Sequence, residues 1–450
     1  MFTNIKLKNF LSFGNVNFNF KKNKNNEKKF IAIYGENGSG KSNFVTAIDL
    51  LCRTLDSFEN KKKSVEFIDF LNNSSKDNDL SDIPQAFSYW ILENDIQNYI
   101  ASCRTIDCNE PTEVEYSFIL NGIEGIYKYS FDKQFINESL YYLAGKQRGT
   151  LFNITTKDGK IEKKFYGEFF TSTKVRAEYD DLIEKYWGKY TFLAIIVNET
   201  KEKNKSYVEK SLCSFVMDVI SMLRQISVYR RKDNTQTTGI ACCEPHNMLF
   251  ELSEGTVAKN KVSYLDTLEK ILKDFFTQAY SDIKDVSYER QDDGNNIKYQ
   301  LFFDKMISGK VRHINFANES SGTQQILEIV KMLLGALCGA TVVFDEIDNG
   351  IHDLLLKNIL DSMVENITGQ LIITTHNTLL MEALSSHSAY VISSDYSGNK
   401  EIRCLDEFDR IQSTNNARIK YLKGMFGGIP YGDGIDYDFI INELHIGGGN

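Results

Sequence analysis

The sequence has little proline, no long apolar run and no cysteine pair of the kind that binds zinc. Only 4 prolines occur among 450 residues. No 18 apolar residues follow one another, so we expect no membrane-spanning helix and no membrane partner. The N-terminus alternates like a strand and lacks the apolar core of a signal peptide. The 8 cysteines include no C-x-x-C pair, which excludes a zinc ribbon or zinc hook and favours reduced thiols in the cytoplasm.

Repeats, sustained heptads and a positive charge balance are also missing. Without heptads, no long coiled-coil arm is expected. The net charge of −9 argues against a dedicated nucleic-acid binder. Basic runs at 21–29, 61–63 and 230–232 leave DNA binding possible, although short charge runs usually form solvated loops. The length allows two or three domains, or one large fold with insertions.

What the sequence does contain is a complete phosphate-binding loop at 35–42, reading Gly-Glu-Asn-Gly-Ser-Gly-Lys-Ser. It follows the apolar run 30–34, a predicted strand, and precedes the predicted helix 43–51. This order points backbone N–H groups and the positive end of a helix dipole at one anion. The flanking pattern disfavours the alternative, a chance glycine-rich turn. The sequence therefore predicts nucleotide binding.

Individual loop residues have expected tasks. Lys41 should reach the β- and γ-phosphates, and the Ser42 hydroxyl should bind Mg²⁺. The predicted nucleotide contacts are Gly35, Asn37, Gly38, Ser39, Gly40, Lys41 and Ser42.

The rest of the chain reads as strand pairs, then helices, then a second α/β part. We expect hairpins at 113–131, around Asn121-Gly122, and at 286–303. The polar region 60–81 should be a loop with short helical pieces. Between 177 and 283 the pattern is helical, with 206–228 as a buried helix and 262–283 as an amphipathic one.

Two segments in the last third carry further chemistry. Ser321 and Gly322 begin a predicted apolar helix, which could offer a second anion-binding N-terminus, although serine caps are common. The apolar strand 341–344 ends in Asp345 and Glu346. Asp345 is placed to hold Mg²⁺ through water, and Glu346 to orient or deprotonate an attacking water. Alone, this pair could be an ordinary acidic strand end.

A second apolar strand, from 371, ends in His376. Such a position lies at the carboxyl edge of an open α/β sheet, where ligands bind. A lone histidine is more often a satisfied polar residue. The order and spacing of all these segments make their joint occurrence by chance implausible.

Together, GENGSGKS, SSGTQQ, VVFDE, IDNG and ITTH resemble the Walker A, signature, Walker B, D-loop and switch-histidine motifs of ABC ATPases. They are similar to the SMC/RecF/RecN-like branch, as is the opening IKLKNFLSFGN. DEIDNGIH, TTHNTLLM and YLKGMFGGIP resemble ATPases of bacterial anti-phage and abortive-infection operons, of the RloA/AbiL type and more distantly AriA of PARIS. The likeness covers both ends of the chain and is weakest at 177–261.

The resemblance implies an α/β fold. It would be an ABC-ATPase head with a phosphate-loop parallel sheet, an antiparallel β subdomain and a helical insertion before the signature. We expect the head to comprise 1–176 and 284–450, with the insertion at 177–283.

The resemblance also implies roles for single residues. Asp345 and Ser42 would bind Mg²⁺, Glu346 would be the catalytic base and His376 a γ-phosphate sensor. Asp348 would contact a second subunit. Ser321 and Gly322 would contact the partner's nucleotide, more loosely because Thr323 replaces a common glycine. Gln85 is the best candidate for the Q-loop glutamine, a possible Mg²⁺ contact.

Three functions compete. The first is a slow, regulatory ATPase switch of an anti-phage system, which forms a homodimer or higher homo-oligomer around ATP and Mg²⁺. A phage protein could trigger it, and a separate RloB-like or TOPRIM-type nuclease would be its effector. About 75 residues follow His376, too few for a usual nuclease domain. Tail acids Asp433, Asp436 and Asp438 are better explained as solvated than as a metal site.

The second function is a RecF/SMC-like repair or recombination ATPase that binds duplex DNA, for which salt-dependent binding would be the evidence. The third is a transporter's nucleotide-binding subunit. Roughly 280 residues separate the phosphate loop from the signature, far more than a compact ATPase domain needs.

Overall fold

The computed structural model describes residues 1–22, 26–74, 95–144, 147–230, 251–383, 385–408, 417–429 and 436–446. The strands are β1 (Phe2–Phe10), β2 (Phe13–Asn19), β3 (Phe30–Gly35), β4 (Thr112–Leu120), β5 (Ile123–Phe131), β6 (Phe135–Ala144), β7 (Gln147–Lys157), β8 (Lys160–Phe165), β9 (Ile226–Tyr229), β10 (Glu254–Ala258), β11 (Ile283–Asp293), β12 (Asn296–Ile307), β13 (Lys310–Asn315), β14 (Thr341–Phe344), β15 (Gln370–Thr374), β16 (Ala389–Ser394) and β17 (Lys400–Cys404). The helices are α1 (Lys41–Leu55), α2 (Ser57–Ser74), α4 (Ile96–Ser102), α5 (Thr173–Tyr186), α6 (Phe192–Glu202), α7 (Lys205–Ser211), α8 (Ser214–Leu223), α9 (Val262–Ala279), α10 (Ser321–Leu337), α11 (Asp353–Met363), α12 (Leu380–Ala383), α13 (Ala417–Leu422) and α14 (Tyr437–Ile446).

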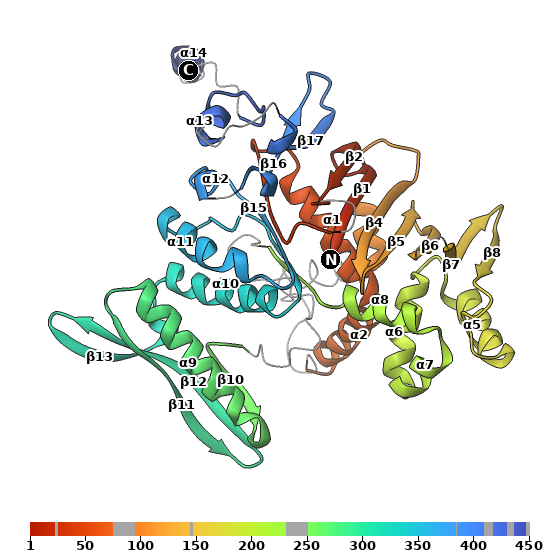
Figure 1. Ribbon diagram of the computed structural model, residues 1–450, viewed down its shortest axis with the longest axis horizontal. Coiled ribbons are helices and arrows are strands. Elements are labelled where there is room, and N and C mark those ends of the chain that lie inside the picture. Colours follow the sequence, from red (N-terminus) through yellow and green to blue (C-terminus); the bar gives the residue numbers. More distant parts are fainter. Residues whose placement is uncertain are drawn as a thin grey trace.

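A 6-stranded sheet in the order β17-β16-β3-β15-β14-β9 forms the centre of the molecule (Figure 1). Its ladders β14–β9, β14–β15, β15–β3 and β3–β16 are parallel, and only the β16–β17 pair is antiparallel. The predicted α/β class with a phosphate-loop parallel sheet is confirmed. Parallel strands of this kind are covered on both faces, which explains why β3, β14 and β15 are buried along their whole length.

Alternate residues of β3 enter two different cores. Ile31 and Ile33 join a cluster with α1, the antiparallel sheet and α4–α8, whereas Ala32 and Tyr34 join one with α9, α10 and α11. This period of two is what an extended strand imposes on its side chains. The central sheet therefore separates two cores, and its two faces are fixed by the residue register of β3.

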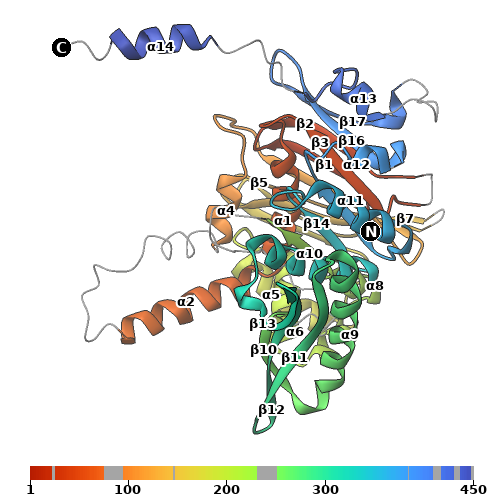
Figure 2. The ribbon, with the colours of Figure 1, turned by 90° about the vertical axis from the view of Figure 1, so that its left-hand side faces the viewer.

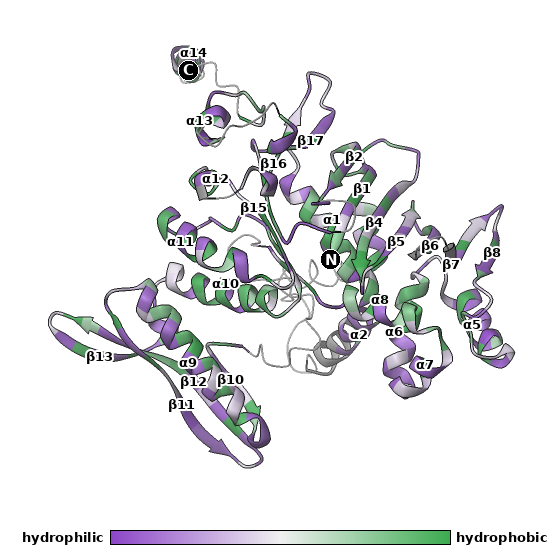
Figure 3. Cartoon of the chain, viewed as in Figure 1, coloured by the Kyte–Doolittle hydropathy of each residue, from purple (hydrophilic) through white to green (hydrophobic). Residues whose placement is uncertain are grey.

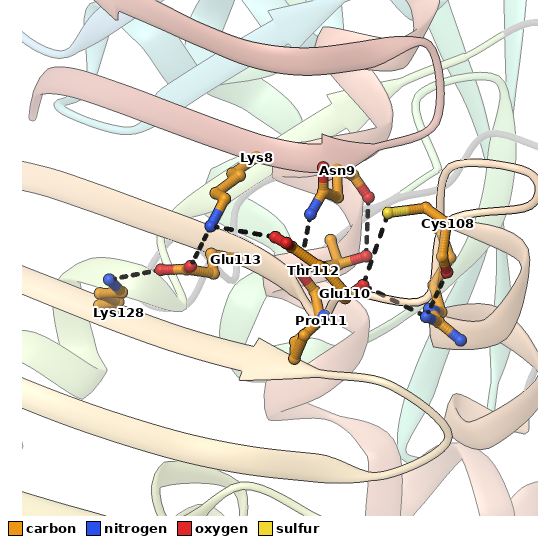
Figure 4. A network of polar contacts seen from close by, with 9 residues as sticks. Lys8, Asn9, Cys108, Glu110, Pro111, Thr112, Glu113 and Lys128 are labelled. Atoms are coloured by element: carbon orange, nitrogen blue, oxygen red, sulfur yellow. Dashed lines mark hydrogen bonds and ion pairs between the residues drawn. The ribbon is translucent and has the colours of Figure 1, made fainter.

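The second sheet is antiparallel, 7-stranded, and ordered β2-β1-β4-β5-β6-β7-β8. The predicted hairpin around Asn121-Gly122 is confirmed as β4–β5, with positive φ at both turn residues (52° and 75°). Figure 4 shows the polar network along its β1–β4 ladder. There Lys8 pairs with Glu113 at 3.1 Å, and Glu113 pairs with Lys128 at 2.7 Å.

The same network fixes the end of β1. The Thr112 hydroxyl donates to the Asn9 carbonyl at 2.8 Å, and Asn9 Nδ2 donates to the Pro111 carbonyl at 3.2 Å. Asn9 and Leu11 have positive φ values of 53° and 49°, so the chain turns sharply here. The anchored turn holds Ser12 and Phe13 beside the phosphate loop.

The third sheet is an arm of β10, β11, β12 and β13, with α9 packed against β11 (Figures 1 and 2). The predicted hairpin at 286–303 is confirmed as β11–β12. In Figure 3 the outer end of this hairpin is largely hydrophilic, while the central sheet is hydrophobic. The amphipathic helix predicted at 262–283 is α9, which ends at Ala279.

Three predictions of local structure were wrong. The region 60–81 is not a loop up to residue 74, because the single 18-residue helix α2 runs from Ser57 to Ser74. The predicted buried helix 206–228 is instead α7, α8 and then strand β9. Strand β9 pairs in parallel with β14, so sheet pairing outweighs the helical pattern there. Strand β10 was also missed, and 177–283 is therefore not helical throughout.

The C-terminal helix α14 stands apart from the body of the molecule (Figure 2). It exposes large apolar side chains, such as Leu444 at 72% and Tyr437 at 65%. Among the described residues, none of the helices combines the length and the apolar character needed to cross a bilayer.

Candidate functional site

The predicted site residues follow three neighbouring strands of the central sheet. The phosphate loop follows β3, Asp345 and Glu346 follow β14, and His376 comes two residues after β15, which lies between the other two strands. Because these strands are parallel, their carboxyl ends meet at one edge of the sheet, where α/β proteins bind ligands.

The phosphate loop leads directly into α1, whose first residue is Lys41. Gly40 precedes it at φ 109°, and a Cβ built there would lie 2.7 Å from the Phe13 ring. Any other residue at position 40 would therefore be strained and would collide with Phe13. The Lys41 ammonium donates to the carbonyls of Gly35 at 2.9 Å and Glu36 at 3.1 Å.

The loop and the acidic strand end are joined by a direct contact. Ser42 Oγ donates to Asp345 Oδ1 at 3.2 Å, although the two residues are 303 apart in sequence. Thr374 Oγ1 donates to the same carboxylate oxygen at 2.8 Å. A hydroxyl and a carboxylate that meet in this way are the hard oxygen ligands that Mg²⁺ prefers.

Glu346 is held in a conformation that residues other than glycine seldom adopt. Its φ is 53°, its peptide N–H donates to Thr374 Oγ1 at 2.8 Å, and its side chain is exposed. On either side of Glu346, the peptide N–H of Asp345 donates to the Tyr229 carbonyl at 2.9 Å, and the peptide N–H of Ile347 donates to the Thr374 carbonyl at 3.2 Å. Strain that is fixed by surrounding bonds is typical of functional positions, and it turns the Glu346 carboxylate towards solvent.

The backbone of His376 is hydrogen-bonded to the side chain of Asp348 of the same chain. The His376 peptide N–H donates to Asp348 Oδ2 at 3.2 Å. Burial, and then the positive charge of Lys41, lower the pKa of His376, while Asp348, Glu346 and Asp345 oppose that shift. Burial also lowers the pKa of Lys41, against the attraction of the same carboxylates. The two bases and three acids therefore share one electrostatic environment.

The predicted signature residues lie beside the 348–350 turn. A Cβ built at Gly322 would lie 3.3 Å from the Gly350 carbonyl, and Gln325 donates to the Asn349 carbonyl. These described contacts are with the turn and not with the phosphate loop. Ser321 is exposed at the start of α10.

Thr323 has a structural task in this chain. Ser320 caps α10 by accepting from the Thr323 N–H at 3.2 Å, and the two hydroxyls lie 2.9 Å apart. Thr323 is buried, so its side chain points into the protein and away from the exposed Ser321.

Some site residues are missing from the sequence-based prediction, and one predicted residue lies outside the described part. Gln85 falls between 75 and 94, outside the described residues. Thr374, which orders both acids, was missed, although its place at the end of a strand beside the acidic strand could have indicated it. Lys400, which donates to the Gly38 carbonyl at 2.7 Å, has no motif around it.

The described part of the tail motif, residues 421–429, contacts strand β16 and the first glycine of the loop. Gly428 lies against the first glycine of the loop, since its Cβ position is 3.4 Å from the Gly35 Cα. At φ 67°, a side chain at 428 would also meet Val391 at 2.5 Å. Tyr421 donates to the Gly428 carbonyl at 2.8 Å, which holds the segment in place.

The residues present fit a nucleotide and Mg²⁺. Ser39 Oγ in the loop is buried and is among the described polar atoms that have no hydrogen-bond partner. The loop offers glycine backbone at a helix start, which suits a phosphate. Ser42 and Asp345 supply the oxygen ligands for a hard cation.

Comparisons with known proteins give one family match and several similar solved structures. Residues 263–382 match the family model described as "AAA domain, putative AbiEii toxin, Type IV TA system". That segment is similar to AAA-type ATPase domains. No curated protein matches the chain.

Similar solved structures include the SMC head domain from Thermotoga maritima, which is 13% identical with a TM-score of 0.37; the match covers 90% of this chain and 98% of that one. They also include an SmcHead bound to the C-winged helix domain of ScpA, which is 16% identical with a TM-score of 0.43; that match covers 89% and 97%.

Proposed function

We propose that this chain is an ATP-hydrolysing switch that dimerises around ATP and controls a separate effector in defence against phage. The observation that carries the ATPase part is the Ser42–Asp345 contact, which joins the phosphate loop to the acidic strand end. The AAA-type segment supports it as well.

The residues would divide the work by position. Lys41 would leave the carbonyls of Gly35 and Glu36 and bind the β- and γ-phosphates. Ser42 and Asp345 would hold Mg²⁺, which neutralises phosphate charge when bound. Glu346, whose carboxylate is exposed next to this pair, would take the proton of the attacking water. His376 would sense the γ-phosphate as a hydrogen-bonding group.

The exposed Ser321, with Gly322 at the N-terminus of α10, would complete the site of a second copy. ATP would then link two heads, and closure would depend on ATP by mass action. Asp348 holds the His376 backbone in its own chain, and the adjoining turn contacts α10, so the 348–350 turn would connect the two half-sites. Loss of the γ-phosphate would release the pair.

The experiment compares wild type with Glu346→Gln and Lys41→Ala. We expect Glu346→Gln to bind ATP, to hydrolyse it at least 100-fold more slowly and to accumulate as an ATP-bound dimer. Lys41→Ala should lose ATP binding, because the loop loses its positive charge. Calorimetry, ATP turnover and light scattering measure these properties.

Full hydrolysis by Glu346→Gln, or unchanged ATP affinity of Lys41→Ala, would overturn the assignment. Stimulation of turnover by duplex DNA would favour the repair function instead.

The defence role is supported by the words "Type IV TA system" in the matched family description and by the resemblance of DEIDNGIH and TTHNTLLM to anti-phage ATPases. The test is phage plating on cells that carry this gene with its neighbours. Protection should be lost with Lys41→Ala. Protection that persists in that variant would contradict a nucleotide-driven switch.

A further inference from the structure

Two hairpin turns far apart in the sequence meet at the outer side of the phosphate loop. One is the β1–β2 turn with Ser12 and Phe13, and the other is the β16–β17 hairpin, where Lys400 begins β17. Strand β17 also packs along β2. The loop is thereby covered by side chains from both ends of the chain.

The Lys400 ammonium connects these parts. Its Nζ donates to the Gly38 carbonyl at 2.7 Å and to Ser12 Oγ at 2.6 Å. Asn43 Nδ2 donates to the same Ser12 hydroxyl at 2.5 Å, and the Phe13 ring centroid lies 5.7 Å from Nζ. Lys400 is therefore tied to both the loop and the first turn of α1.

Both hydrogen-bond acceptors of Lys400 are neutral. None of the ion pairs described for the chain includes Lys400, whereas Lys21, just after β2, pairs with Glu124 at 2.7 Å. Lys41 also lacks a carboxylate partner among the described residues, since the acceptors described for it there are backbone carbonyls of the loop. Burial lowers the pKa of Lys400, and the negative charge of Glu36 opposes this shift.

An ammonium that is partly buried without a carboxylate costs free energy unless an anion arrives. The anion that this loop is built for is a polyphosphate. The two ammonium groups hold different parts of the loop: Lys41 holds the carbonyls at 35 and 36, and Lys400 the carbonyl at 38, with Nζ 3.4 Å from a Cβ built at Gly40.

We propose that Lys400 is a second cation of the nucleotide site, which contacts the α- and β-phosphates of a bound nucleoside di- or triphosphate. This inference rests on the proposed nucleotide binding. Lys41 serves the β- and γ-phosphates, and the loop N–H groups cradle the α- and β-phosphates. Because Lys400 lies on that middle part of the loop, its charge acts on phosphates that ADP and ATP share.

The test measures binding of ATP, ADP, tripolyphosphate and adenosine to wild type, Lys400→Met, Lys400→Arg and Arg403→Met. Methionine keeps the stem of Lys400 without its charge. Arg403 is the matched control on the same strand, where it pairs with Glu401 at 2.7 Å. We expect Lys400→Met to weaken ATP, ADP and tripolyphosphate about 10-fold each, with adenosine unchanged. The affinities of Lys400→Arg should stay within about 3-fold of those of wild type. The affinities of Arg403→Met should equal those of wild type.

Unchanged ADP affinity in Lys400→Met would overturn the proposal. An equal loss of affinity for adenosine would also overturn it, because adenosine has no phosphate and Lys400 would then have only a structural role. If Lys400→Met does not fold, Ser12→Ala removes one acceptor that orients Lys400; it should weaken ADP and ATP equally, and no change would contradict the inference. Wild type that binds no nucleotide would instead refute the proposed function itself.

Discussion

At the scale of single residues, buried polar groups of this chain are matched to specific partners. Glu138 is fully buried in β6, where it accepts from the N–H groups of Phe192 and Leu193 and from the Tyr127 hydroxyl. These bonds fasten the start of α6 to the antiparallel sheet. Burial nevertheless raises the pKa of Glu138 from 4.5 to about 7, against the pull of those three donors.

This shift predicts a dependence of stability on pH. Because the folded pKa is above the unfolded one, the folded state binds the proton more tightly. The contribution of protonated Glu138 to folding stability is complete below pH 4.5 and is lost as the pH rises through about 7. The loss is on the order of 3 kcal/mol. In thermal scans, we expect the unfolding temperature of wild type to decrease, relative to that of Glu138→Gln, as the pH rises from 5 to 8.

The exposed Glu168→Gln serves as control and should follow wild type at every pH. Parallel pH profiles for wild type and Glu138→Gln would show that Glu138 does not titrate in this range.

At the scale of elements, Gln370 joins the two larger sheets. Its amide is fully buried at the start of β15; Oε1 accepts from the Phe2 N–H at 2.9 Å, and Nε2 donates to the carbonyls of Phe2 and Lys28 at 2.9 Å each. One side chain thus satisfies backbone groups before β3 and at the start of β1. A shift of β1 would also move the turn that covers the phosphate loop.

We predict that Gln370→Leu, which has similar volume, destabilises the chain by about 2–4 kcal/mol, since three buried backbone groups lose their partners. The measurement is the unfolding midpoint in urea. Gln300→Leu is the control and should change little, because Gln300 is an exposed residue of β12 whose Nε2 donates to Glu254 at 3.2 Å. A midpoint for Gln370→Leu equal to that of the control would show that water replaces the amide.

At the scale of the whole molecule, the described contacts of the signature segment are with the 348–350 turn and not with the phosphate loop. The proposed dimer uses this arrangement, because each chain would give its loop to one site and its Ser321 to the other. We predict that Ser321→Arg binds ATP like wild type but hydrolyses little of it. Its bulky charge would lie against the nucleotide of the partner.

Mixing provides the decisive measurement. Ser321→Arg and Lys41→Ala should each be inactive alone, and an equimolar mixture should regain about a quarter of wild-type turnover, because half of the dimers would contain one intact site. A mixture that stays inactive, or Ser321→Arg with normal turnover, would contradict the shared site. Ser320→Arg is unsuitable as a control, since Ser320 caps α10.

The sequence by itself determined the local units. Residues 35–42 specify a strand, loop and helix because glycine positions, a lysine and the flanking periodicity act within one short segment. The Asn121-Gly122 turn is local in the same way, since both residues tolerate positive φ. Asp345, Glu346 and His376 could be placed at one sheet edge because parallel strands align their carboxyl ends.

Only the tertiary structure decided how distant segments meet. Strand β9 lies in an apolar stretch that reads equally well as helix, and its pairing with β14 settles the choice. Gly428 and Lys400 reach the loop by contacts across more than 300 residues, which leave no periodic trace in the sequence. Local spacing encodes local geometry, whereas contacts between remote segments depend on packing of the whole chain, and that packing turns the phosphate loop into a complete site.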